Sequence, residues 1–300
     1  MADANIKGFT VAAFGDTHTG STVGLMRPET YNLIDGTVKP SKAQRALWRV
    51  FMDYAQIIKK QRAGRRLVVV LNGDLCDGVH HNTPQIVTRR MAEQQRLFVD
   101  VWQAFVDVVE FGDDDQVYII NGTDLNGTHG SPSDADIIGR AIGAVPWKPP
   151  GNSGVDGWHP WQHLKLDVNG LRLEFAHHPP AGLGRREHTK GNSVRGWLRD
   201  YQSKLHVRKK KIPRYVIWSH VHTAYRTTMT FDTGRPDGPD STAVILPAFQ
   251  GKTDYVHQKL PFTMPTTIGG WWCNIDDDGA HFDRLEYIEL GLDRKAVKID

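Results

Sequence analysis

The first 121 residues alternate between short apolar runs and long amphipathic segments, and this alternation restricts the fold more than any other feature of the sequence. Residues 9–14, 67–74 and 116–121 have the pattern of strands, and the middle run contains consecutive β-branched residues that suit a strand covered on both faces. Residues 41–64 and 88–111 place apolar side chains at helical spacing. Strands that alternate with helices predict an α/β fold with a central sheet.

The second half of the chain is dominated by strand patterns. Residues 163–178 alternate around Asn169-Gly170, the pair preferred by a tight type I′ hairpin turn. Strands that follow βαβ units predict two sheets packed face to face in a single domain over 1–300, with a core at about 8–250 and C-terminal strands and a tail over 251–300. The other expected elements are helices over 131–144 and 191–205 and strands over 214–222, 224–231 and 242–249.

The composition directs attention to a metal site, because the chain carries fourteen histidines and histidine is the commonest metal ligand. Cys76 and Cys273 are the only cysteines, which argues against a disulfide framework and a cysteine-based zinc site. The N-terminus lacks a signal-peptide core, and no window reaches the length of apolar sequence that a membrane span needs. We therefore expect a soluble cytoplasmic protein without a membrane partner.

Polar motifs follow five of the expected strands. The loops beyond one end of a layered α/β sheet converge on a crevice, so these side chains are expected to lie close together. Carboxylate and imidazole together suit Mn, Fe, Zn or Co, and two ions bridged by one carboxylate would use all the candidates. Such a pair activates water and clamps the oxygens of a phosphoryl group. The motifs are "GDTH" at 15–18, "NGDLCDG" at 72–78, "NGTDLNGTH" at 121–129, "AHHPP" at 176–180 and "SHVH" at 219–222.

In this order the motifs resemble those of the calcineurin-like metallophosphoesterase superfamily: Asp-x-His, Gly-Asp-x-x-Asp-Gly, a turn similar to Gly-Asn-His, a histidine, and Gly-His-x-His. The resemblance covers about residues 10–225. It implies a four-layer α-β-β-α sandwich of two mixed sheets. It also implies hydrolysis of phosphomonoesters or phosphodiesters at a dinuclear metal centre, through attack by a hydroxide held between the ions.

The resemblance also implies a set of metal ligands. Asp77 is expected to orient a ligand histidine as an outer acceptor. His178 remains an alternative to its neighbour as a ligand, and Ser219 replaces the glycine that usually precedes the penultimate histidine. One ion would be held by Asp16, His18 and His222 and the other by His177 and His220, and Asp74 would bridge the two ions.

The third motif departs from the family pattern. Thr123 stands where the family has the asparagine that completes the second metal site, and Asp124 stands where it has histidine. Asn126 or Asp124 would then supply the missing ligand, or water would fill the position. His129 is the expected acid that protonates the leaving group.

The segment 182–214 is rich in Lys and Arg and lies between two of the metal motifs. Basic residues beside a phosphoryl site suit a nucleotide or nucleic acid, and Trp197 and Tyr201 within the segment could stack on bases. The alternative is a solvated helix face followed by a basic loop. The aromatic, Gly-rich stretch 251–276 would line the site or a dimer contact, and the sequence does not choose between them.

The expected function is that of a hydrolase, a metal-dependent phosphodiesterase or nuclease, with Mn as the first expected metal and Fe, Zn, Co or Ni as alternatives. A phosphomonoesterase or protein phosphatase is the second hypothesis. A protein phosphatase is disfavoured, because those members of the family carry an additional arginine-bearing motif. Here Gly78 follows Asp77, and the third turn has no arginine. The third hypothesis is a non-catalytic binding module with the same fold.

Overall fold

The structure is a computed structural model of the whole chain. It contains two mixed sheets, a short two-stranded ribbon and four helices among the residues that it describes. Those residues are 8–79, 84–123, 132–147, 157–180, 182–183, 189–232, 238–253 and 265–290.

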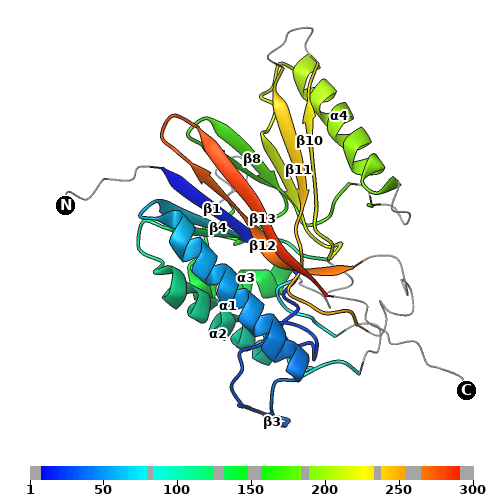
Figure 1. The fold of residues 1–300 in the computed structure, drawn as a ribbon. Helices are drawn as coiled ribbons and strands as arrows, with labels where there is room; N and C mark the ends of the chain where they lie inside the picture. The colour runs from blue at the N-terminus through cyan, green and yellow to red at the C-terminus, as the bar shows by residue number, and fades with distance from the viewer. Residues whose placement is uncertain are drawn as a thin grey trace, which may run out of the picture.

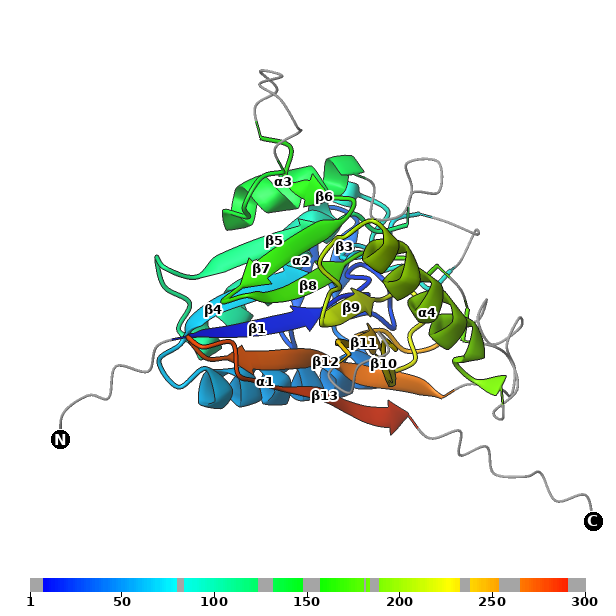
Figure 2. The same ribbon diagram turned by 90° about the horizontal axis from the view of Figure 1, so that it is seen from above.

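The first sheet has six strands, and β1 lies in its interior between β12 and β4 (Figure 2). Strands β1, β4, β5 and β6 are parallel, β12 is antiparallel to β1, and β13 is antiparallel to β12. In order across the sheet the strands are β13 (His281–Leu290), β12 (Thr266–Ile275), β1 (Phe9–Phe14), β4 (Arg66–Leu71), β5 (Gln116–Ile120) and β6 (Pro160–Trp161).

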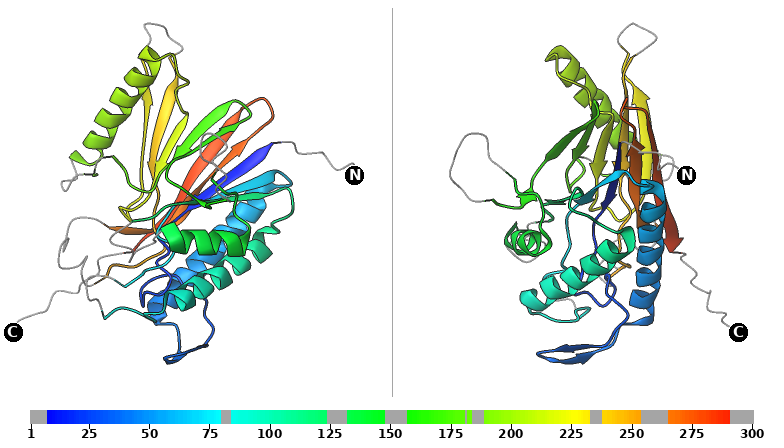
Figure 3. Two further views of the ribbon diagram at one scale, coloured as in Figure 1. Left: turned by 180° about the vertical axis from the view of Figure 1, so that it is seen from behind. Right: turned by 90° about the vertical axis from the view of Figure 1, so that its left-hand side faces the viewer.

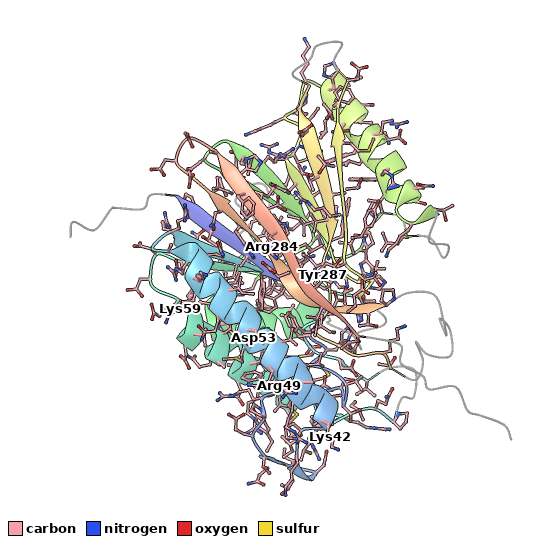
Figure 4. The ribbon with its side chains drawn as sticks, viewed as in Figure 1. Lys42, Arg49, Asp53, Lys59, Arg284 and Tyr287 are labelled. Atoms are coloured by element: carbon pink, nitrogen blue, oxygen red, sulfur yellow. The ribbon has the colours of Figure 1, made fainter. Side chains whose placement is uncertain are left out.

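Helices α1 (Lys42–Arg62), α2 (Met91–Val109) and α3 (Pro132–Ile142) cover the outer face of this sheet (Figure 1). Helix α1 begins where the sequence predicts, because Ser41 and Gln44 form a capping box. Its apolar side packs on the sheet, while Lys42, Arg49, Asp53 and Lys59 are exposed and project from the opposite side (Figure 4).

The second sheet has five strands, and α4 (Asn192–Val207) covers its outer face. Strands β8, β9 and β11 are parallel to one another, and the strands at both edges are antiparallel to their neighbours. The order is β10 (Tyr225–Thr230), β11 (Asp240–Ile245), β9 (Tyr215–Trp218), β8 (Leu171–Phe175) and β7 (Leu164–Val168). The separate ribbon consists of β2 (Tyr31–Leu33) and β3 (Gly36–Val38).

The two sheets pack face to face, with the helices on the two outer sides (Figure 3). Alternation along β1 shows the layering: Ala12 and Phe14 pack against the helices, whereas Val11 and Ala13 pack between the sheets. The four-layer α-β-β-α sandwich of two mixed sheets is therefore confirmed, and it is the fold implied by the resemblance to the calcineurin-like metallophosphoesterases. No helix among the described residues is both long enough and apolar enough to cross a membrane.

The expected helices are present with small shifts at their ends, whereas two expected strands are shorter: 214–222 is a strand only over β9, and 242–249 ends at Ile245 in β11. The hairpin of β7 and β8 turns at Asn169 and Gly170, both with positive φ, as a type I′ turn requires. The sequence leaves segment 251–276 open between the site and a dimer contact, and the structure shows where its second part lies. Residues 266–275 form β12 in the interior of the first sheet, with Trp271 and Trp272 buried on its opposite faces.

Candidate metal centre

Loops that follow β1, β4, β8 and β9 bring seven possible metal ligands together beyond the carboxyl ends of these strands. The parallel strands of each sheet end on the same side, and Asn72 connects the sheets by donating hydrogen bonds to the carbonyl of Ala176 and the hydroxyl of Ser219. The seven residues fall into three overlapping groups whose ligand atoms lie within 4.8 Å of one another: Asp16, His18 and His222; Asp16, Asp74 and His177; and His177, His178 and His220.

The first group is built around the carboxylate of Asp16, which is fully buried. Its Oδ2 accepts a hydrogen bond from the backbone N–H of His220 at 3.0 Å. Its Oδ1 lies 3.3 Å from Nε2 of His222 and 3.9 Å from Nε2 of His18, yet accepts no hydrogen bond of good geometry within the described part of the chain. A buried carboxylate oxygen that faces imidazole nitrogens in this way fits a divalent transition metal.

Asp77 and Gln250 hold the ring of His18 in place. Nδ1 of His18 lies 3.1 Å from Oδ1 of Asp77, and the side-chain amide of Gln250 donates to the same oxygen at 3.2 Å. Because Nδ1 is engaged there, Nε2 faces Asp16 and Asp74. The structure thus places Asp77 where the sequence predicts an outer acceptor, whereas no sequence pattern points to Gln250.

Asp77→Asn should weaken metal binding about 10–100-fold, as replacing an outer partner of a ligand histidine commonly does. The amide keeps the size of the carboxylate but loses the charge that favours the proton on Nδ1 of His18. Titration of chelator-treated protein with Mn²⁺ measures the effect, and Asp53→Asn on the exposed side of α1 is the matched control. An unchanged affinity in Asp77→Asn would show that the contact does not orient His18.

The second group surrounds the carboxylate of Asp74. Its Oδ2 lies 3.1 Å from Nε2 of His177, and Nδ1 of His177 lies 2.8 Å from the carbonyl oxygen of Asn72. The Asn72 carbonyl accepts the Nδ1–H of His177, so Nε2 is the atom available to a metal. Burial distinguishes His177 from His178, the two alternatives for the ligand that follows β8. His177 is buried beside both carboxylates, whereas His178 is exposed and reaches only the group with His220.

The sequence does not predict Thr123 as a member of the site, yet it contacts residues of both the second and the third group. Its backbone N–H donates to Oδ1 of Asp74 at 2.6 Å, and its hydroxyl lies 3.0 Å from Oδ2. The same hydroxyl lies 3.3 Å from Nε2 of His177, 3.2 Å from Nε2 of His178 and 3.2 Å from Nδ1 of His220. One feature of the sequence could have identified Thr123: it stands at the position of the family's metal-binding asparagine. Asp124, Asn126 and His129, the residues weighed for this motif, lie outside the described residues.

The carboxylates keep the site electrically negative. Burial opposes ionisation of Asp74, but the neighbouring His177 and His18 hold its pKa well below the usual value. Burial also opposes protonation of His177, and the charges of Asp74 and Asp16 outweigh it and raise its pKa to about 9. Burial and the charge of His177 lower the pKa of His220 to about 4. In the metal-free protein a proton on His177 therefore balances part of the carboxylate charge, and a bound cation would replace it.

Backbone strain is concentrated at these ligands. Five of the seven have a positive φ, a region that side chains other than glycine seldom adopt. A Cβ atom at Gly122 would overlap Oδ1 of Asp74, so glycine is required for the close approach of the third loop. Strained backbone of this kind gathers at functional sites because it aims side chains that relaxed loops would not. The five are Asp16 (48°), His18 (42°), Asp74 (49°), His220 (68°) and His222 (55°).

Comparison with known proteins yields only distant structural matches. No protein-family model matches the sequence, and no curated protein is significantly similar to it. Vacuolar Protein Sorting 29 from Cryptosporidium parvum is similar in structure, with 11% identity, a TM-score of 0.38 and coverage of 94% of this chain and 99% of that chain. A conserved uncharacterised protein from Streptococcus pneumoniae, a predicted phosphoesterase, has 7% identity, a TM-score of 0.31 and coverage of 92% and 97%.

The structure of PhoD is also similar, with 9% identity and a TM-score of 0.41, and the match covers 91% of this chain and 65% of PhoD. The TM-scores of all three matches are low, and so are their identities. Function is therefore inferred from the geometry of the seven candidate ligands.

Proposed function

We propose that this chain, a four-layer sandwich with the fold of the calcineurin-like metallophosphoesterases, is a hydrolase that cleaves phosphodiester bonds at a centre of two divalent metal ions. One observation carries the proposal: imidazole nitrogens of His18, His177 and His222 lie within 4.8 Å of oxygens of the buried carboxylates Asp16 and Asp74. His177 also forms a further group with His178 and His220. Oδ1 of Asp16 is buried and accepts no hydrogen bond within the described part of the chain, and an ion bound among the neighbouring imidazoles would explain this.

Asp74 is the proposed bridging ligand. Its Oδ2 lies 3.9 Å from Nε2 of His18, in the first group, and 3.1 Å from Nε2 of His177, in the second. The same oxygen thus faces both groups, as a bridge requires. We propose that the first ion is held by Asp16, His18 and His222, and the second by His177 and His220. Mn is the first proposed metal, with Fe, Zn, Co or Ni as alternatives that the same ligands accept.

The two ions would supply an activated water and would neutralise the oxygens of the phosphoryl group. The chain's own contribution is to fix the ligands: Asp77 orients His18, the Asn72 carbonyl orients His177, and Thr123 holds the carboxylate of Asp74. His129 remains the proposed acid for the leaving group. His178 and His220 are exposed, so a substrate can reach the third group, which they form with His177, from solvent.

The basic segment supports a nucleotide substrate only in part. Residues 208–211 precede β9, whereas His220 follows it, so this basic run and the metal ligands lie at opposite ends of the second sheet. Lys211 also forms an ion pair with Asp167 at that far end. Arg199, which is also exposed, lies nearer the beginning of α4 than residues 208–211 do. The proposed substrates are therefore nucleotides or short nucleic-acid segments, whose backbone need not reach the distant run.

The decisive experiment is a substrate panel with Mn²⁺. Bis-p-nitrophenyl phosphate, single-stranded DNA, RNA and cyclic nucleotides should be hydrolysed faster than p-nitrophenyl phosphate, and chelation should stop all hydrolysis. Faster hydrolysis of the monoester would favour the phosphomonoesterase hypothesis. Protein that binds no metal by elemental analysis and hydrolyses nothing would favour the non-catalytic binding module.

A further inference from the structure

A cavity of about 230 Å³ lies between the outer face of the second sheet and α4. It adjoins the candidate metal centre, because His178 forms part of its wall and also belongs to the third ligand group, with His177 and His220. Pockets for drug-sized ligands measure about 300–1,000 Å³, so this cavity suits a single ring system with its polar substituents. The residues that give it its chemistry are Lys165, Glu174, His178, Trp197, Tyr201 and Trp218.

One side of the cavity is aromatic. Trp197 and Tyr201 lie one helical turn apart on α4, and their rings stack with centroids 4.7 Å apart and an interplanar angle of 23°. Trp218 meets Trp197 edge-on at 5.0 Å. These contacts fix the orientation of Trp197, which remains partly exposed beside the cavity. A rigid, partly exposed aromatic wall is what a planar ligand ring needs for contact at low entropic cost.

The cavity also contains a buried carboxylate. Glu174 on β8 is 8% exposed, and its Oε2 accepts a hydrogen bond from the hydroxyl of Tyr201 at 2.6 Å. Lys165 lies 3.3 Å from the other oxygen. Burial, together with the charge of Glu174, raises the pKa of Tyr201, so its hydroxyl stays a donor near neutral pH. These two contacts offset the cost of burying the carboxylate, and each of its oxygens keeps a second lone pair that can accept an N–H group of a ligand in the cavity.

We propose that this cavity binds the nucleobase of the substrate, with the ring against Trp197 and an exocyclic amino group donating to Glu174. The inference rests on the proposed function, because it places the base beside the phosphate that the metal centre would cleave. It makes the substrate a nucleotide or the end of a nucleic acid, and it favours adenine, guanine or cytosine over uracil. Carboxylates accept hydrogen bonds from base amino groups in the same way in protein–DNA interfaces.

The test measures binding rather than hydrolysis. Chelator-treated protein is titrated by calorimetry with AMP, GMP, CMP, UMP and, as the probe without a base, ribose 5-phosphate. The amino-bearing nucleotides should bind about tenfold more tightly than ribose 5-phosphate, which is the effect expected of one aromatic stacking contact. Trp197→Ala should remove this difference and Trp197→Phe should retain most of it. Trp48→Ala, a partly buried tryptophan on α1, is the control and should behave as wild type.

Glu174→Gln tests the polar contact separately and keeps the size of the side chain. It should reduce the preference for GMP and CMP over UMP while leaving the affinity for ribose 5-phosphate unchanged. The inference is overturned if ribose 5-phosphate binds as tightly as the nucleotides, or if Trp197→Ala and Trp197→Phe both match wild type. Those results would leave phosphodiester hydrolysis by the metal-loaded protein untouched. Conversely, a base preference in a protein that hydrolyses no phosphoester would refute the proposed function alone.

Discussion

Asp74→Asn should lower kcat for phosphodiester hydrolysis by at least about a hundredfold, since changing even an outer partner of a metal ligand costs 10–100-fold. The amide preserves the size of the side chain and can still accept the hydrogen bond that Thr123 donates to Oδ1. It removes the negative charge at the oxygen that faces His18 and His177. A bridging ligand serves both ions, so metal content should fall together with activity.

Steady-state hydrolysis of bis-p-nitrophenyl phosphate with Mn²⁺ measures the first effect, and elemental analysis of the purified protein measures the second. Asp53→Asn is the matched control, because Asp53 is exposed on the solvent side of α1 (Figure 4) and lies in no ligand group. If Asp74→Asn kept both its metal and its activity, the bridging role of Asp74 would have to be abandoned.

Trp271→Ala should lower the free energy of unfolding by about 3–5 kcal/mol, the usual loss when a fully buried aromatic side chain is truncated. Trp271 is 0% exposed and lies between the two sheets, where its ring meets that of Tyr215 at 5.3 Å. Its Nε1–H also donates to Asp283 at 3.0 Å. The substitution therefore leaves a cavity in the layer that joins the sheets and removes a hydrogen bond.

Urea unfolding of the chelator-treated protein measures this loss without a contribution from bound metal. Trp48→Ala provides the comparison, because Trp48 is only partly buried at the surface of α1. The loss at Trp48 should be clearly smaller than the loss at Trp271. Equal losses would mean that β12 does not contribute to the packing between the sheets in the way described.

The sequence predicts the helices and strands that are determined by residues within or next to them. Helix α1 follows from Ser41 and the apolar spacing behind it, and the β7–β8 hairpin follows from Asn169-Gly170. Strand β12 shows no alternation because both of its faces are covered. A Cβ atom at Gly270 would overlap the ring of Tyr54, so that glycine reflects the packing of α1 on the sheet. No local pattern carries that information.

The residues of the candidate site also divide into those that the sequence predicts and those that depend on contacts between distant parts of the chain. Asp16, His18, Asp74 and the histidines after β8 and β9 follow strands whose ends meet at one edge, so their order along the chain was informative. Thr123 could not be assigned, because its role depends on how the third loop approaches Asp74 in space. The sequence presents the basic segment 182–214 as one feature, whereas in the structure its residues 208–211 lie at the end of the second sheet that is away from the candidate metal ligands.

The positive φ angles of the ligands have a consequence for the abundance of the protein. Each such residue costs roughly 1–3 kcal/mol, with Asp and His among the residues that tolerate this region best. A sequence optimised for stability alone would place glycine or asparagine there, so the metal-free chain is less stable than its core allows. A ligand that binds only the folded state offsets that loss. Metal supply would then set how much of the chain escapes proteolysis, in addition to how much is active.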